Sequence, residues 1–225
     1  MDMPEKRWNF RCVIYDCDGV LFDSVEVNRR FYNHICSTLG RSPLTEQELR
    51  YAHSHTFQET IHLLFQAENG PIQRAFELLP RIDSRDYISS LQLEPHLLQT
   101  LDFLKERGIL RAISTNRTTS MQHILDRFDL RPYFDLVVTA LDVKNPKPHP
   151  ESVEKIMEIF HLNRLEVVFV GDSEIDRQAA ESSGIKFIAY KNREIAADAF
   201  IDDHLALIRL LAEEGNPGNH NRAKL

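Results

Sequence analysis

The chain has 225 residues, a formal net charge of −7 and 42% hydrophobic residues, a composition typical of a soluble globular protein. This length allows one domain of ordinary size and a smaller one. The acidic balance argues against a general nucleic-acid-binding protein. No apolar stretch approaches the roughly 18 residues of a membrane span, and the N-terminus lacks the apolar core of a secretory signal. Three cysteines without metal-site spacing predict reduced thiols in a cytoplasmic protein.

The first predicted element is a buried strand that ends in two carboxylates. Residues 12–15 form a continuous apolar run, typical of a strand covered on both faces in a parallel sheet. Asp16 and Asp18 follow this run, and Gly19 permits a sharp turn. Ligands of open parallel sheets bind just beyond the carboxyl ends of the strands, so we expect chemistry at these acids. An acidic turn without function is the alternative interpretation.

Residues 24–92 have the pattern of short helices. Apolar side chains recur at helical spacing from residue 25 until Gly40, a natural helix end. Thr45 and Thr56 each open a sequence that matches the helix capping box. Pro71 can begin a further helix, and another is expected near residues 83–91. The segment therefore predicts four or five helices and no strand.

From residue 95 onward, helices and strands alternate. The predicted helices cover residues 95–107, 118–128, 151–160, 174–183 and 195–212, and the predicted strands cover residues 109–114, 134–139, 166–170 and 186–190. Such a βαβ series predicts an α/β fold with a doubly wound parallel sheet. The polar end of the chain, residues 215–225, is expected to be loose.

The stretch Asp16-x-Asp18-Gly19-Val20-x-x-Asp23-Ser24 resembles the first motif of the haloacid dehalogenase superfamily, specifically of its phosphatases. The resemblance extends over residues 11–212. It implies a Rossmann-like catalytic core, residues 1–23 and 93–225, with a helical cap domain, residues 24–92, inserted after the first strand. It also implies that Asp16 attacks phosphorus and that Asp18 is the general acid and base. Because a carboxylate attacks a phosphoryl group only where cations offset the repulsion, a metal ligand, a lysine and a hydroxyl are expected elsewhere.

Two later motifs resemble the phosphate-binding elements of this family. Thr115-Asn116 follows the strand at residues 109–114, where a hydroxyl and backbone amides would bind phosphoryl oxygens. Ser114 is the alternative hydroxyl, and capping of the next helix is the alternative role of Thr115. Lys147 lies in a Lys-Pro-x-Pro sequence, and a fixed ammonium there would offset the charge between phosphate and carboxylate. A proline-rich surface loop is the alternative for Lys147.

The segment Gly171-Asp172-Ser173 resembles the fourth motif of the family. The resemblance places Asp172 with the Asp16 carboxylate and the Asp18 backbone carbonyl around one divalent ion. Hard oxygen ligands with retained waters suit Mg²⁺. Asp176, together with Ser173, is expected to orient Lys147 or the waters of the metal from the first helical turn.

Within the family, these residues favour a Mg²⁺-dependent phosphatase that hydrolyses a small phosphomonoester, such as phosphoglycolate or a sugar phosphate. Asp18 argues against a dehalogenase, which lacks the second acid, and against phosphonate-cleaving relatives, which have a small residue at that place. A sugar phosphomutase of the beta-phosphoglucomutase type has a histidine where Asn28 aligns, and asparagine cannot transfer that proton. The phosphomutase and a non-catalytic binding or regulatory protein remain the alternatives. A phospho-acceptor receiver domain is disfavoured, because its acidic residue follows the third strand.

The turn His53-Ser54-His55 between two predicted cap helices is a candidate for substrate selection. Neutral imidazoles and a hydroxyl there would favour a small, polar leaving group, and Arg50 could bind a second anionic group. The alternative is that these side chains coat a solvated turn. Zinc is disfavoured because no acidic or thiol partner stands at ligand spacing. The expected partner is a small-molecule phosphate ester, with no nucleic acid or membrane, and the chain is expected to be a monomer or a homodimer.

Overall fold

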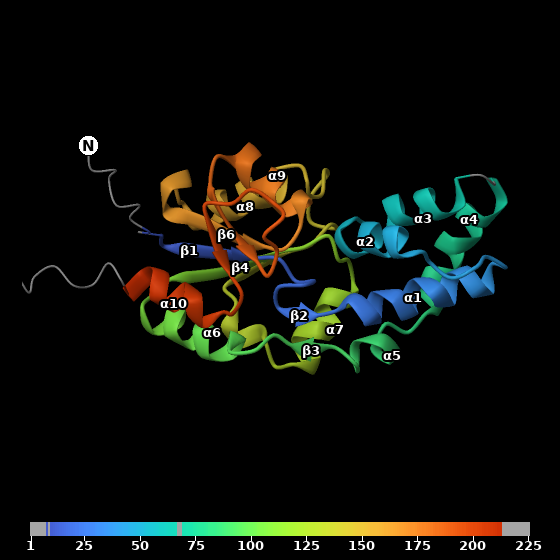
Figure 1. Cartoon of the computed structure of the whole chain (residues 1–225), viewed down its shortest axis with the longest axis horizontal. Coiled ribbons are helices and arrows are strands. Elements are labelled where there is room, and N and C mark those ends of the chain that lie inside the picture. Colours follow the sequence, from blue (N-terminus) through green and yellow to red (C-terminus); the bar gives the residue numbers. More distant parts are fainter. Residues whose placement is uncertain (1–7, 9, 67–68, 213–225) are drawn as a thin grey trace, which may run out of the picture.

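The computed structural model describes residues 8, 10–66 and 69–212 (Figure 1). A six-stranded sheet lies at the centre, with strand order β5-β4-β1-β6-β7-β8. Its strands are β1 (Cys12–Tyr15), β4 (Leu110–Ser114), β5 (Leu136–Val138), β6 (Val167–Gly171), β7 (Lys186–Tyr190) and β8 (Ala199–Ile201). Every neighbouring pair in this sheet is parallel. The predicted α/β fold with a doubly wound parallel sheet is therefore confirmed.

Helices cover both faces of the sheet. Successive residues of β1 point to opposite faces, so this strand contributes to the core on each side. Val13 and Tyr15 belong to the core cluster that includes helices α6 (Leu97–Glu106), α7 (Ser120–Arg127) and α10 (Leu205–Ala212). Cys12 and Ile14 belong to the cluster on the other face, under α8 (Glu151–Phe160) and α9 (Glu174–Ser183). All four residues of β1 are fully buried. This explains why the strand reads as a continuous apolar run instead of an alternating one.

The helical segment that follows β1 has a hydrophobic core of its own. It consists of α1 (Val25–Thr38), α2 (Glu46–Ser54), α3 (Phe57–Phe65), α4 (Asn69–Leu78), a 3₁₀ turn (Leu79–Arg81) and α5 (Arg85–Ile88). Ile35, Leu49 and Ile61 lie in this separate core, and the helices extend to one side of the sheet (Figure 1). Both expected capping boxes, at Thr45 and Thr56, are present. Helix α4 begins at Asn69 and not at Pro71. Pro71 therefore lies in its first turn, where proline is tolerated.

Two short strands join the two ends of this helical segment. β2 (Phe22–Asp23) pairs antiparallel with β3 (Gln92–Leu93). The expectation of no strand in residues 24–92 is therefore wrong at Gln92. Two residues are too few to show a strand period, and only pairing between segments far apart in the sequence defines these strands.

The predicted final helix over residues 195–212 is confirmed only in its second part, α10, and is wrong before that. Its first part is the edge strand β8, which pairs with β7. Lys191 N donates to the carbonyl of Ile201 at 2.8 Å beside this pairing. Asp203 then accepts a hydrogen bond from the Leu205 amide at 2.7 Å, at the start of α10. The end of the chain expected to be loose lies outside the described residues. Among the residues that are described, no helix is long and apolar enough to cross a membrane.

Candidate active site

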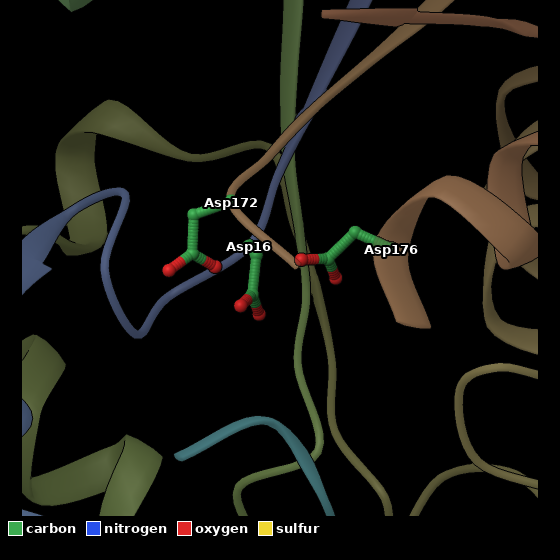
Figure 2. A group of neighbouring side chains, drawn as sticks. All are labelled: Asp16, Asp172 and Asp176. Carbon is green, nitrogen blue, oxygen red and sulfur yellow. The ribbon is translucent and has the colours of Figure 1, made fainter. Parts of the chain in front are cut away.

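The sequence-predicted acids and the hydroxyl meet at one edge of the sheet because their strands are neighbours. Asp16, Thr115 and Asp172 directly follow β1, β4 and β6, and β1 lies between the other two. Carboxylate oxygens of Asp16, Asp172 and Asp176 lie within 4.8 Å of one another. Figure 2 shows these three side chains directed toward a common space, with Asp176 reaching it from α9.

Lys147 connects two of these acids. Its Nζ donates to Asp16 Oδ1 at 2.8 Å and to Asp176 Oδ1 at 2.6 Å, and the residue is 3% exposed. Burial lowers the pKa of Lys147, but Asp16 and Asp176 outweigh this effect and raise the pKa above its usual value. The lysine is therefore a fixed cation against the Asp16 carboxylate.

The acids carry more negative charge than Lys147 neutralises. Burial raises the pKa of Asp16, Lys147 lowers it, and Asp176 and Asp172 raise it, so that the net pKa lies above its usual value. Burial also raises the pKa of Asp172. Carboxylate oxygens crowded in a buried site are suitable ligands for a hard divalent cation. Asp176 already uses Oδ1 for Lys147 and Oδ2 for the backbone and hydroxyl of Ser173, so Asp16 and Asp172 have the freer oxygens.

Gly19 allows the loop after β1 to approach Asp172. Its φ is +71°, and a Cβ at this position would lie 2.0 Å from Asp172 Oδ2. A side chain is therefore excluded for two separate reasons, the backbone conformation and the space. The sequence predicted a turn at Gly19, whereas the close approach to Asp172 required the structure.

The two candidate hydroxyls point to different places. Ser114 is fully buried, and its Oγ lies 2.8 Å from Ser152 Oγ on α8. Thr115 lines the cavity next to the acids, and its Oγ1 accepts the Arg117 amide at 3.1 Å. Of the two, Thr115 is therefore the hydroxyl that a phosphoryl group could reach.

Asn116 forms a bridge between segments. Its Nδ2 donates to the carbonyl of Lys147 at 2.9 Å and to the carbonyl of Ser54 at 3.2 Å. The first contact holds the lysine loop, and the second connects the sheet edge to the end of α2. The side-chain amide of Asn116, which was predicted to bind phosphate, thus donates its hydrogens to other parts of the protein.

Asp18 is held by Arg117, a residue that the sequence analysis did not single out. Arg117 donates through Nε to Asp18 Oδ2 and through Nη2 to Oδ1, both at 2.6 Å. Ser24 Oγ donates to Oδ1 at 2.5 Å, and Asn28 Nδ2 donates to it at 3.3 Å. Burial raises the pKa of Asp18, but the charge and hydrogen bonds of Arg117 outweigh it and lower the pKa to about 2. The only sequence signal for Arg117 is a basic residue directly after Thr115-Asn116.

The predicted turn His53-Ser54-His55 is wrong in its bounds, because His53 and Ser54 are the last two residues of α2 and His55 caps that helix; the three residues also differ in their surroundings. His53 Nε2 is 3.7 Å from Asp172 Oδ2, and its Nδ1 is 3.0 Å from Asn28 Nδ2. Burial lowers the pKa of His53, but the acids around it raise the net value. His55 stacks on Tyr51 with ring centroids 3.5 Å apart.

One cavity joins this turn to the sheet edge. Its volume is about 720 Å³, and its lining includes Asp16, Lys147, His53, Ser54 and His55. Arg50 is exposed and is absent from the described lining residues. The cavity can therefore admit a ligand to the acids, and three of the four predicted cap residues border it.

Comparison with known proteins shows the family. Residues 13–190 match the model of the haloacid dehalogenase-like hydrolase family. Phosphoglycolate phosphatase of Rhodobacter capsulatus is 29% identical over 192 residues, which cover 79% of this chain and 83% of the relative.

Solved structures give the same family. A Geobacter sulfurreducens hydrolase of subfamily IA, variant 1, is 39% identical with a TM-score of 0.73, over 90% of this chain and 97% of the other. A Thermotoga maritima protein described as a beta-phosphoglucomutase is 26% identical with a TM-score of 0.70, over 91% and 100%. With Asp16, Asp18 and Asp172 after its strands and Lys147 in the loop before α8, the chain belongs to the haloacid dehalogenase-like hydrolases and is a phosphatase of that family.

Proposed function

We propose that this enzyme is a Mg²⁺-dependent phosphatase that hydrolyses a small-molecule phosphomonoester through a phospho-aspartyl intermediate on Asp16. The observation that carries this proposal is the position of Asp16, whose Oδ1 is fixed by Lys147 at 2.8 Å within the group of buried acids. The names of the phosphoglycolate phosphatase relatives support the reaction class. Asp16, Asp172 and the backbone carbonyl of Asp18 would hold the metal, which supplies positive charge to the phosphoryl oxygens.

In the first half of the reaction, the free oxygen of Asp16 attacks phosphorus and the bond to the leaving oxygen breaks. Lys147 and the hydroxyl of Thr115 bind the non-bridging oxygens, so the charge that gathers there is neutralised. Asp18 gives a proton to the leaving alkoxide. Arg117 donates to both oxygens of Asp18 in this structure, so when Asp18 takes up this proton from solvent on one oxygen, it would give up one of these hydrogen bonds and keep the other.

In the second half, Asp18 takes a proton from water, and the resulting hydroxide attacks phosphorus. The Asp16–phosphate bond breaks, and Asp16 returns as a carboxylate. Asp176 keeps Lys147 in place through both halves, because it accepts from Nζ at 2.6 Å.

Phosphate release from a panel of metabolites, with Mg²⁺ or with a chelator, tests this function. We expect release that requires Mg²⁺ and that excess Ca²⁺ inhibits, since calcium prefers more ligands and a looser geometry. Asp16→Asn should abolish turnover. Asp126→Asn is the matched control, because Asp126 is an exposed acid paired with Arg131. Turnover by Asp16→Asn close to that of the wild type would refute the mechanism.

One observation keeps the sugar phosphomutase as a second candidate. The mutase histidine aligns with Asn28, and the structure places His53 of α2 beside Asn28 at 3.0 Å. A histidine is therefore present at this place in space, although it comes from a different position in the sequence. A mutase would interconvert sugar phosphates with little phosphate release and would depend on a sugar bisphosphate. A chain with neither activity would be the non-catalytic alternative.

The remaining assignments are part of the same proposal. Residues 24–92 would act as a mobile cap, and the contacts of Ser54 with Asn116 and of His53 with Asp172 would be lost when it opens. The monomeric or homodimeric state and the cytoplasmic location stay predictions. Sedimentation analysis of the purified chain and fractionation of cells that express it would test them.

A further inference from the structure

The cavity over the acids is much larger than a two-carbon leaving group needs. Its volume is about 720 Å³, and its lining includes Asp16 and Lys147 as well as Ser84 and His123. Binding sites for ligands of drug-like size have volumes of about 300–1,000 Å³. Phosphoglycolate would occupy only the end near the acids and leave the remainder to water.

Part of the lining of this cavity is aromatic, and we call this part the aromatic wall. Phe31 of α1 and Tyr87 of α5 line it, both partly exposed, and their ring centroids lie 5.4 Å apart at an interplanar angle of 89°. Phe57 of α3 lines it as well, with its centroid 6.2 Å from that of Phe31. Aromatic side chains set nearly at right angles present both ring faces and ring edges to a ligand. They suit a flat ring better than a chain of hydroxyl groups.

Neighbouring side chains hold the aromatic wall in place. The hydroxyl of Tyr87 lies 2.6 Å from Nδ1 of His34 on α1. Phe31 also packs against Tyr32, with centroids 5.1 Å apart. A ligand therefore meets rings whose orientation is already fixed, which lowers the entropy cost of binding.

The lining of the cavity also contains polar groups from the segment before α5 and from α7. Ser84 Oγ lies 2.7 Å from His123 Nδ1, where the segment before α5 meets α7. Arg85 also lines the cavity, and its guanidinium is paired with Asp83 at 2.6 Å. Hydroxyl and imidazole groups in the cavity lining can hydrogen-bond the ring nitrogens or exocyclic groups of a ligand.

We propose that the substrate is a phosphomonoester whose alcohol carries a planar heteroaromatic ring, and not a two-carbon acid or a simple sugar. The ring would lie against Phe31 and Tyr87, with its polar edge toward Ser84 and His123. The proposal rests on the proposed function, because the phosphoryl group would sit at Asp16. Such a ring can be joined to the phosphate through a ribose, as in a nucleoside 5′-monophosphate, or through one methylene, as in pyridoxal 5′-phosphate.

Comparison of kcat/KM across matched substrates tests the ring requirement. The panel contains nucleoside 5′-monophosphates, pyridoxal 5′-phosphate, ribose 5-phosphate, 2-phosphoglycolate and acetyl phosphate, all with Mg²⁺. We expect at least one ring-bearing ester to exceed ribose 5-phosphate and 2-phosphoglycolate by about tenfold or more. Whether nucleoside 5′-monophosphates or pyridoxal 5′-phosphate have the higher kcat/KM shows whether a ribose or one methylene joins the ring to the phosphate. A kcat/KM for 2-phosphoglycolate or ribose 5-phosphate above every ring-bearing ester would overturn the proposal.

Variants of the wall separate ring binding from catalysis. Phe31→Leu should lower kcat/KM for the best ring-bearing ester about tenfold and leave acetyl phosphate within about twofold. Tyr87→Leu should act in the same way, whereas Tyr87→Phe, which keeps the ring and loses the contact to His34, should retain the preference. Unchanged ring preference in both leucine variants would also overturn the proposal. Absence of Mg²⁺-dependent phosphate release from every compound of the panel would instead refute the proposed function.

Discussion

Arg117 offers a direct test of how the proposed acid–base group is positioned. Its guanidinium holds both oxygens of Asp18 at 2.6 Å in a site where its side chain is 13% exposed. Replacement by methionine keeps most of the side-chain length and removes both hydrogen bonds. Ser24 and Asn28 still donate to Oδ1 of Asp18, so the carboxylate keeps part of its support.

The size of the effect follows from these contacts. A hydrogen bond to a charged group contributes about 1.5–3 kcal/mol. Because two other donors remain, we count the loss of one such bond, about 2.7 kcal/mol, which is roughly 100-fold in kcat/KM. The loss should appear for alkyl phosphates, whose leaving alkoxide needs the proton of Asp18. It should be small for p-nitrophenyl phosphate, whose leaving phenolate needs no proton.

The assay compares kcat/KM of wild type and Arg117→Met for an alkyl phosphate and for p-nitrophenyl phosphate. Removing one partner of a buried ion pair also destabilises the fold, by about 3 kcal/mol, which lowers the active fraction for both substrates alike. The ratio of the two kcat/KM values is therefore the diagnostic quantity. Arg131→Met, at an exposed ion pair, is the control. An equal fall on both substrates, or no fall on either, would refute the positioning role of Arg117.

Further predictions concern the acids and hydroxyls around this pair. The pKa of Asp18 is about 2 in the folded protein and about 3.9 in the unfolded chain. The ionised Asp18 therefore stabilises the fold above about pH 3.9, and this contribution is lost as the pH falls toward 2. The urea midpoint of the wild type should drop more between pH 5 and pH 3 than that of Asp18→Asn. Because burial raises the pKa of Asp172, Asp172→Asn should stabilise the metal-free fold by about 1 kcal/mol and lose metal-stimulated turnover; a lower melting temperature in chelator would contradict this. Thr115→Ala should lower kcat/KM for every ester by roughly 100-fold. Ser114→Ala should instead cost about 1 kcal/mol in unfolding free energy and leave KM unchanged, and equal kinetic effects of the two variants would contradict the separation of these hydroxyls.

The elements that the sequence predicted well are those whose signals are local. The apolar run of β1 and the capping boxes at Thr45 and Thr56 appear as expected. The meeting of Asp16 and Asp172 was predictable as well, because parallel strands bring their carboxyl ends to one edge of the sheet. Each of these features depends on short stretches of sequence or on a general rule of topology.

The features that the sequence did not predict depend on contacts between distant segments. β8 has three residues with an edge position in the sheet, and its apolar residues also fit a helical period. Arg117 meets Asp18 across 99 positions of sequence, and nothing in either local pattern indicates the pair. The size of the cavity likewise depends on how α1, α3 and α5 pack together. The expectation of a small, polar leaving group came from His53-Ser54-His55 alone, and it did not include the aromatic wall that other helices supply.

The helical segment contacts the proposed reacting groups themselves, and this links substrate selection to catalysis. Asn28 of α1 donates to Asp18, the carbonyl of Ser54 accepts from Asn116, and His53 lies 3.7 Å from Asp172. A shift of the helical segment would therefore move a donor of the acid–base group and a neighbour of the acid cluster together. Phe31 lies on α1 together with Asn28, and Tyr87 lies on α5 of the same helical segment. A leaving group that fits against these rings would hold α1 and α5 in the position where Asn28 reaches Asp18, so binding energy far from phosphorus would be used to place the acid–base group. A poorly fitting ester would still reach Asp16 and Lys147, but with Asp18 less well placed, so the discrimination should appear in kcat as well as in KM.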